Sequence, residues 1–487
     1  MGLDAAMELG FQSLSQEVSR QSLPVEGKIP PWLDGALLRN GAALFEVGDN
    51  RVSHWFDGLA MVHRFSFEAG GVTYTNRFLR TDAYRSVIED GTIPTGFATG
   101  GSYVTRLWNL VFGTPTDNTN VHVARFGDEF VALTEVPRYV AFDPVTLETR
   151  GEFRFADDLS GTINCAHVIP DPHRGETIGL LTEFGRRHTY RFFRVPKGSR
   201  RRELIADLSV EKPAYVHSFS LTRNYVVLTE HPYRVNPRSF FLPGGESFTD
   251  HFDYEPERGT KFHVIDRETG DVAASIRTNP FFVFHHANAF ERSAGEADGN
   301  TTIDDCYLDG DAGREIVVDL VSYPDDRVLS GLYLDAMANW FRSGTDGQLW
   351  RFRLPLDDGR VESRLLYDGI EFPQVPRLDR TRPHRYVYGQ GAAEADGNHL
   401  AKVDCETGET ARWEEPGVFV EEPIVVRSPA GTPASDDGVV LVTALNTTER
   451  RTDLLVFDAE ALVLQARAPL PHVVPFGFHG RYVHVAP

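Results

Sequence analysis

The chain has 487 residues, with 49 basic against 70 acidic side chains and a formal net charge of −21 at pH 7. This surplus of negative charge repels nucleic-acid phosphates and argues against nucleic acid as a partner. The 41% hydrophobic content is enough for a large core, and no run of 18 or more apolar residues predicts a membrane-spanning helix.

The basic residues are unusual because only five are lysine and the other 44 are arginine. Acidic surplus with scarce lysine is expected of a protein adapted to high salt, where screening relieves self-repulsion. A GC-rich genome that favours arginine codons would give an ordinary acidic protein the same composition. Three scattered cysteines, Cys165, Cys306 and Cys405, are too few for a disulfide framework and favour a reducing cytoplasm.

Short β-branched or aromatic runs bounded by turn residues recur along the chain and predict strands. They are Val72–Asn76, Tyr225–Thr229, Glu315–Asp319 and Val439–Thr443. Helical periodicity is rare. The 43 glycines and 29 prolines are dispersed, and no linker marks a boundary, so residues 1–487 are expected to form one all-β domain.

Turns centred on aspartate follow several apolar runs and predict hairpins. They lie at Phe142–Thr146, Val264–Gly270, Val403–Gly408 and Val456–Ala459. Their repetition at intervals of several tens of residues is typical of a fold built from repeated sheets.

Four histidines, each in an apolar or aromatic context, are the most informative feature of the sequence. They are His167, His217, His285 and His479. The gaps of about 50, 68 and 194 residues exclude a local zinc finger or a helix-borne HExxH motif, so any shared metal site must be assembled by the fold. A seven-bladed ring of about 70 residues per blade would separate the histidines by one, one and three blades.

Three N-terminal motifs carry a resemblance to a known family. They are Pro31–Gly41, His54–Gly58 and Asn76–Leu79. With the four histidine motifs, they make the chain similar to the carotenoid cleavage oxygenases over nearly its whole length. The resemblance implies a seven-bladed β-propeller with a helical and loop cap over the metal-bearing face.

The resemblance also implies that His167, His217, His285 and His479 bind iron(II). His285 is chosen over His286 because the family's ligand lies three residues before an asparagine, and His286 would point away if the segment is a strand. A lone histidine would ordinarily be a satisfied core residue, but four matched motifs in order favour ligands. Imidazole suits iron, zinc, copper or nickel, so the residues alone do not name the metal.

Three glutamates match the family's outer carboxylates, which orient the histidine rings by accepting their free N–H protons. They are Glu135, Glu371 and Glu422. Each stands in an apolar context where an unpaired carboxylate would be costly, although isolated glutamates are more often solvated. Glu421 competes with Glu422, since strand alternation would turn only one of them inward.

Four ligands on an octahedral metal leave two positions open for dioxygen and an alkene. By resemblance, the reaction is oxidative scission of one carbon–carbon double bond into two carbonyl products. No catalytic residue beyond the metal centre and no further cofactor site is expected, since the glycine-rich stretch Thr99–Ser102 lacks the lysine of a phosphate loop.

The segment Thr116–His122 and the pair Thr134–Glu135 resemble the animal β-carotene oxygenases, which favours cleavage of β-carotene to retinal. Lignostilbene-cleaving relatives carry lysine where Thr134 stands. Eccentric or apocarotenoid cleavage, stilbenoid cleavage, retinyl-ester isomerohydrolysis and a non-catalytic binding propeller are the alternatives. The intact four histidines argue against the last of these.

Access of a hydrophobic polyene suggests two further segments. The apolar stretches 103–113 and 239–244 have loop-like surroundings and could form a rim that docks on a membrane. A cap that packs the first stretch against the propeller is the alternative, and both can hold. The N-terminus lacks the basic start and apolar core of a signal peptide, so a cytoplasmic protein with peripheral membrane docking is expected.

Overall fold

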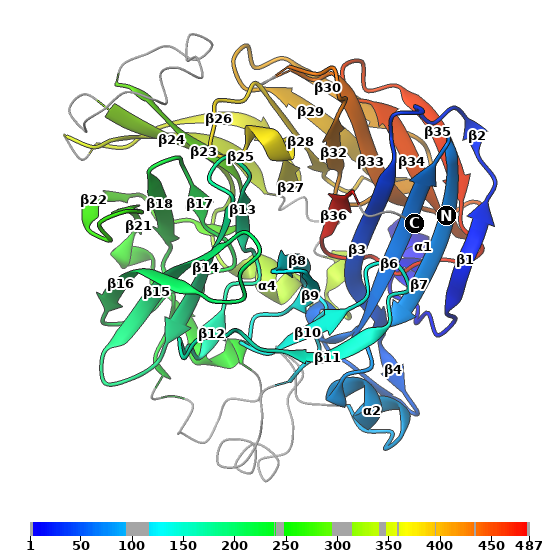
Figure 1. Ribbon diagram of the computed structural model, residues 1–487, viewed down its shortest axis with the longest axis horizontal. Helices are drawn as coiled ribbons and strands as arrows, with labels where there is room; N and C mark the ends of the chain where they lie inside the picture. Colours follow the sequence, from blue (N-terminus) through cyan, green and yellow to red (C-terminus); the bar gives the residue numbers. More distant parts are fainter. Residues whose placement is uncertain are drawn as a thin grey trace.

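The computed structural model describes residues 3–93, 116–237, 239, 248–294, 314–339, 347–357, 360–394, 396–432 and 435–484. Within these ranges, seven antiparallel sheets of four or more strands stand around a common axis (Figure 1). The expected all-β, seven-bladed propeller is therefore confirmed.

The first blade joins the two ends of the chain. Its strands are β1 (Val18–Leu23), β3 (Gly35–Leu44), β6 (Leu59–Glu68), β7 (Gly71–Phe78) and β36 (Gly480–Val483). The C-terminal strand β36 pairs with β3 on the inner side of this blade, with Ala36 opposite Val483 and Arg39 opposite Gly480. This pairing closes the ring.

The next three blades follow in chain order. The second contains β8 (His122–Phe126), β9 (Glu129–Leu133), β10 (Tyr139–Phe142) and β11 (Thr149–Phe153). The third contains β12 (Ile163–Asn164), β13 (Ile169–Asp171), β14 (Glu176–Glu183), β15 (His188–Pro196) and β16 (Glu203–Val210). The fourth contains β17 (Ser220–Leu221), β18 (Tyr225–Glu230), β21 (Thr260–Asp266) and β22 (Val272–Thr278).

The last three blades complete the circuit. The fifth contains β23 (Phe282–Ser293), β24 (Arg314–Tyr323), β25 (Gln348–Pro355) and β26 (Glu362–Asp368). The sixth contains β27 (Ile370–Gln374), β28 (Tyr386–Gly391), β29 (His399–Asp404) and β30 (Thr410–Glu414). The seventh contains β2 (Glu26–Gly27), β31 (Val418–Val420), β32 (Ile424–Arg427), β33 (Gly438–Asn446), β34 (Arg451–Asp458) and β35 (Leu464–Pro469).

Short elements lie outside the blades. The helices are α1 (Leu3–Gly10), α2 (Asp82–Ile88) and α4 (Arg327–Gly331), with 3-10 turns η1 (Trp55–Asp57), η3 (Thr249–His251), η4 (Pro256–Arg258) and η6 (Arg377–Asp379). Two small ribbons pair β4 (Glu46–Val47) with β5 (Asn50–Arg51) and β19 (Tyr233–Val235) with β20 (Phe252–Tyr254). No helix in the described ranges has both the length and the apolar character needed to cross a membrane.

The four predicted strands fall within β7, β18, β24 and β33, and the four predicted turns join antiparallel outer strands. Each of these turns uses its aspartate carboxylate to accept main-chain N–H groups two or three residues further on. Asp143, Asp266 and Asp404 each accept two such bonds, and Asp458 accepts one from Ala461. The hairpin prediction is confirmed.

The predicted number of blades between successive histidines is also confirmed. His167 lies between β12 and β13 of the third blade, and His217 lies just before β17 of the fourth. His285 lies within β23 of the fifth blade, and His479 lies just before β36, which completes the first. The histidines are therefore one, one and three blades apart.

The described part of the cap places α4 and η1 over one end of the axis, where Val328 and Trp55 line a cavity. In Figure 1, α4 lies behind β8. Segment 103–113, predicted to form a docking rim, lies outside the described residues. Of 239–244, only Ser239 is described.

Buried ion pairs link neighbouring blades. Arg267, at the turn between β21 and β22, is fully buried and donates to Asp171 at 2.9 Å and Glu176 at 2.5 Å in the third blade. Its second terminal nitrogen, Nη1, donates to the carbonyls of Thr222 and Arg223. One guanidinium thus satisfies four acceptors that would otherwise face a low-dielectric interface.

Replacing Arg267 by methionine removes the cationic partner of the buried Asp171 and the partly buried Glu176. We expect the free energy of unfolding to fall by about 3–5 kcal/mol, measured as a lower urea midpoint. Arg194→Met, which removes the half-exposed pair with Glu203, is the matched control and should cost less than about 1 kcal/mol. Equal losses in the two variants would contradict the clamp.

Candidate metal centre

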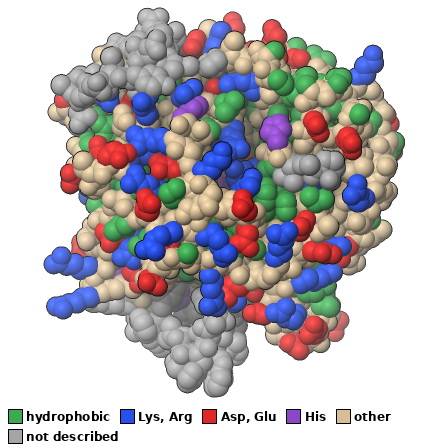
Figure 2. Space-filling model, viewed as in Figure 1, with side chains coloured by type: hydrophobic (Ala, Val, Ile, Leu, Met, Phe, Trp, Pro, Cys, Tyr) green, Lys and Arg blue, Asp and Glu red, His purple; other side chains and the backbone are tan. Residues whose placement is uncertain are grey.

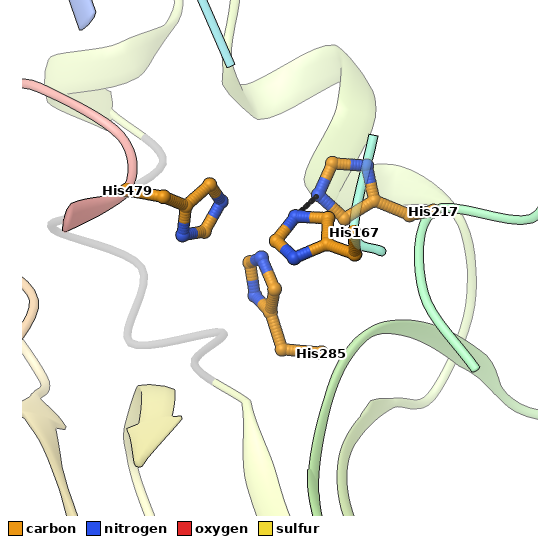
Figure 3. A group of neighbouring side chains, drawn as sticks. All are labelled: His167, His217, His285 and His479. Carbon is orange, nitrogen blue, oxygen red and sulfur yellow. Dashed lines mark hydrogen bonds between the residues drawn. The ribbon is translucent and has the colours of Figure 1, made fainter. Parts of the chain in front are cut away.

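The structure brings the four predicted histidines together on the propeller axis. Figure 3 shows the rings of His167, His217, His285 and His479, hereafter the histidine layer, turned toward a common centre. One ring nitrogen from each lies within 4.8 Å of the others. Such a group can hold a metal ion, and the assignment of the four as its ligands stays a prediction.

The spacing fits imidazole ligands on one metal. The Nε2 atoms of His167 and His217 are 3.1 Å apart, close to the ~3.0 Å separation of adjacent ligands with ~2.1 Å bonds at a right angle. The Nε2 atom of His285 is buried and has no hydrogen-bond partner in the described structure. A buried unpaired acceptor is costly unless a cation or donor meets it, so the donor set fits a divalent metal.

Irregular backbone gives His285 and His286 different directions. The pairing of β23 with β24 shifts register between Val283 and Asn288, which marks a bulge at this point. His285 faces the axis, whereas the ring of His286 contacts the Ser218 hydroxyl through Nδ1 and the Thr229 hydroxyl through Nε2. His286 has both nitrogens occupied and lies outside the layer.

Glu135 orients His217. Nδ1 of His217 donates to Oε1 of Glu135 at 2.7 Å, and the Tyr215 hydroxyl donates to the same oxygen at 2.5 Å. The carboxylate fixes the tautomer that leaves Nε2 free to face the centre. Burial lowers the pKa of His217, and Glu135 opposes this shift only in part. The net lowering of the pKa favours the neutral ring.

Glu371 orients His285 in the same way. Nδ1 of His285 donates to Oε2 of Glu371 at 2.6 Å, and the Tyr323 hydroxyl donates to Oε1 at 3.0 Å. The amide of Phe372, whose φ is +50°, also donates to this carboxylate. Burial opposes ionisation of Glu371, but the interactions with His285 and these hydrogen bonds outweigh it and lower the pKa.

Glu422 orients His479. Nδ1 of His479 donates to Oε1 of Glu422 at 2.9 Å, and the Gly480 amide donates to Oε2 at 2.6 Å. Burial raises the pKa of Glu422 to about 7, opposed in part by Arg39, whose guanidinium lies 3.4 Å away. The outer carboxylate role of all three glutamates stays a prediction.

The prediction that only one of Glu421 and Glu422 turns inward was wrong. Glu421 and Glu422 lie in the connection between β31 and β32 rather than within a strand, and both side chains are buried. Glu421 accepts from the Gly477 amide at 2.6 Å and from the Thr443 hydroxyl. It therefore supports the loop that carries His479 instead of facing solvent.

Several contacts near the histidine layer were not predicted from the sequence. His167 forms no bond to a glutamate among the described residues, and burial with the neighbouring imidazoles holds its pKa well below the ordinary value. His122, on the inner strand β8, stacks on His167 with ring centroids 5.6 Å apart. Tyr215 lies two residues before His217, in a segment without strand structure, so strand alternation gives no signal for it. His122 and Tyr323 carry no such signal either.

A large cavity lies on one side of the layer. It has a volume of about 1120 Å³ and is called the apolar cavity below. His217, His285 and His479 face it, and its walls are mainly aromatic and aliphatic. Its aromatic wall residues are Trp55, Phe56, Phe284, Tyr323, Phe372 and Phe478.

A second cavity, of about 750 Å³, lies on the other side and is called the polar cavity. The chain direction separates the two. Phe284 and Phe478, just before His285 and His479, line the apolar cavity, whereas His286 and Gly480, just after them, line the polar one. The layer thus forms a partition across the axis.

Sequence comparisons agree over nearly the whole chain. A family model described as retinal pigment epithelial membrane protein matches residues 11–484. The chloroplastic carotenoid cleavage dioxygenase 8 homolog A of Oryza sativa subsp. japonica is 32% identical over 97% of this chain and 86% of its own length. The mitochondrial carotenoid-cleaving dioxygenase of Macaca fascicularis is 30% identical, over 95% and 92%. The carotenoid isomerooxygenase of Galleria mellonella is 32% identical, over 94% and 93%.

Solved structures give the same picture. A glutamate-to-glutamine mutant of the Synechocystis apocarotenoid oxygenase superposes with a TM-score of 0.84 at 26% identity, covering 99% of both chains. A cobalt-substituted form of that enzyme superposes with a TM-score of 0.81 and the same coverage.

The contrast between His285 and His286 gives a matched pair of variants. His285→Ala should abolish stoichiometric metal binding, measured by metal analysis after gel filtration, because it removes a ring that faces the centre. His286→Ala should retain the metal, since that ring contacts hydroxyl groups away from the layer. Comparable metal loss in both would contradict the assignment.

Glu371→Gln tests the carboxylate support. The glutamine amide is nearly isosteric with the carboxylate but lacks the negative charge that makes the His285 ring a stronger metal ligand. Metal affinity should therefore fall about 10 to 100-fold. Competition with a chelator measures it. Glu409→Gln, the same change at an exposed position, is the control, and unchanged affinity in Glu371→Gln would remove Glu371 from the support of the centre.

Proposed function

The chain belongs to the carotenoid cleavage oxygenase family, a family of carotenoid cleavage dioxygenases, and on that premise we propose that it is an iron(II) enzyme that cleaves β-carotene to retinal. Oxidative cleavage of a carotenoid or apocarotenoid is the activity of the family. The observation that carries the proposal is that three rings of the histidine layer face a large, mainly apolar cavity.

The apolar cavity suits a long conjugated hydrocarbon. Its lining is predominantly aromatic and aliphatic with a few polar groups, as in common pockets for apolar ligands. Aromatic walls bury a polyene, exclude water and align one double bond beside the layer through flat packing contacts. The substrate would thus be oriented by shape rather than by charge.

The lining also supports a neutral substrate. Among the described residues that line the apolar cavity, no lysine or arginine occurs. Thr134 is one of these residues, at the position where lignostilbene-cleaving relatives carry lysine. A phenolic stilbene would find no cationic partner there, which favours a carotenoid.

Iron(II) is the proposed metal. The donor set is four neutral imidazoles, which accept several divalent first-row metals. The solved Synechocystis enzyme accepts cobalt, as its cobalt-substituted form records. A site of the same kind here would exchange metals, so iron must be tested by reconstitution.

The residues of this chain divide the work of the reaction. When bound, iron(II) supplies a redox-active centre at which dioxygen can be activated beside the double bond. Glu135, Glu371 and Glu422 hold the three Nδ1 protons, so the opposite nitrogens stay directed at the centre. One C=C bond and one O2 give two C=O bonds, so no external proton or electron is needed.

Product analysis tests the function. Protein reconstituted anaerobically with iron(II) is given β-carotene in air, and the products are separated by chromatography. Retinal alone is expected, with one labelled oxygen per molecule from labelled O2. The His285→Ala protein, treated in the same way, should give no product.

Other products would change the proposed scission site or substrate. Longer apocarotenals would keep the dioxygenase and move the scission site. Turnover of an apocarotenal but not of β-carotene would place the enzyme with the apocarotenoid oxygenases. No product from either substrate with iron bound would contradict the proposed function.

A further inference from the structure

The polar cavity has a basic end. Arg380 lines it directly, and Arg481 follows Gly480, which also lines it. Arg377 is exposed, whereas Arg380 and Arg481 are half-buried. The three act electrostatically on one another, which places their charges close together at one end of the axis.

These guanidinium groups differ from several arginines buried elsewhere. Those are paired with carboxylates, as in Arg202–Asp157, Arg267–Asp171, Arg292–Glu315 and Arg351–Asp319, and the buried Arg64 donates to the Ser66 hydroxyl and the Pro144 carbonyl. Within the described residues, the side chains of Arg377, Arg380 and Arg481 form no ion pair or hydrogen bond. The chain has a net charge of −21, so three neighbouring arginines without carboxylate partners are unusual in it.

The nearest carboxylate does not neutralise them. Glu422 acts on Arg380 electrostatically, but it already accepts hydrogen bonds from Gln374, His479 and the Gly480 amide. Burial and repulsion from Arg377 lower the pKa of Arg380 to about 10, so it remains charged at neutral pH. Positive charge in this cavity is therefore uncompensated.

Two buried polar atoms point to a ligand as well. Ser220, 2% exposed on β17, lines the polar cavity, and its hydroxyl has no hydrogen-bond partner among the described residues. The Nδ1 atom of His122 is buried and also without a partner there. Unpaired buried polar groups are uncommon in folded proteins and call for an explanation.

We propose that the polar cavity is a binding site for a small oxyanion, held by Arg380 and Arg481 with the Ser220 hydroxyl as a further donor. Guanidinium groups bind such anions through charge-assisted, often bidentate hydrogen bonds. The site lies behind the histidine layer, on the side away from the apolar cavity. It is independent of the proposed carotenoid cleavage.

The basic end lies away from the apolar cavity. Arg380 lines the polar cavity, whereas Val328 of α4 lines the apolar cavity on the other side of the histidine layer. Figure 2, viewed as in Figure 1, shows Lys and Arg side chains near the middle of the face.

Inorganic phosphate is the probe. It is titrated into the metal-loaded full chain by calorimetry, with sodium chloride adjusted to keep the ionic strength constant. Saturable binding at one site is expected. Arg380→Gln should weaken phosphate binding at least about tenfold, Arg380→Lys should retain part of it, and Ser220→Ala should weaken it severalfold.

Arg154→Gln is the matched control. It removes the same charge from a side chain that is 79% exposed on the outside of the ring, paired with Glu152, and should leave phosphate binding unchanged. If Arg380→Gln does not fold, Arg377→Gln at the exposed end carries the same test and should also weaken binding.

Three results would overturn the site. The first is no saturable phosphate binding to the wild-type chain. The second is full affinity in Arg380→Gln or, where that variant does not fold, in Arg377→Gln. The third is binding that disappears when the metal is removed but survives Arg380→Gln, which would place phosphate on the metal.

Discussion

The hydrogen bond between a buried imidazole and a buried carboxylate is the interaction on which this structure depends. A neutral ring can face the axis with its Nε2 lone pair only if Nδ1 carries the proton, and a carboxylate enforces that tautomer. The carboxylate then needs donors of its own, because burial disfavours its charge. Tyr215, Tyr323 and the Gly480 amide supply them. Three rings thus require three surrounding networks, and the closed ring of blades brings all of them to one axis.

The common direction of the inner strands turns this centre into a partition. Phe284 and Phe478, just before His285 and His479, line the apolar cavity, whereas His286 and Gly480, just after them, line the polar cavity. These two inner segments therefore contribute to both sides of the layer. At His285 the chain changes from an aromatic to a polar residue, so a single-residue step there helps to set the chemistry of the two sides.

The sequence predicted the parts of this arrangement that repeat. The histidine gaps fitted a ring of seven blades, and β-branched runs with aspartate turns predicted strands such as β18 and β33, because both signals are local or periodic. The supports of the centre could not be predicted in this way. Tyr323 of the fifth blade donates to Glu371 of the neighbouring sixth blade. Glu421 is buried although it lies in a loop, where strand alternation does not apply. Such contacts depend on how the ring closes, which no local pattern encodes.

Arginine makes contacts in this structure that lysine could not make, which the composition alone does not reveal. Arg267 satisfies four acceptors between two blades with one planar group, and a lysine ammonium has neither the five donors nor the fork geometry to do so. The buried Lys402, by contrast, holds one carboxylate, Asp436, and one carbonyl. Arg267 therefore joins two blades, whereas Arg292 and Arg351 pair with carboxylates within the fifth blade. Arg380, which lines the polar cavity, and Arg481, which interacts electrostatically with it, have no carboxylate partner among the described residues. The proposed anion explains these two arginines better than the packing of blades does.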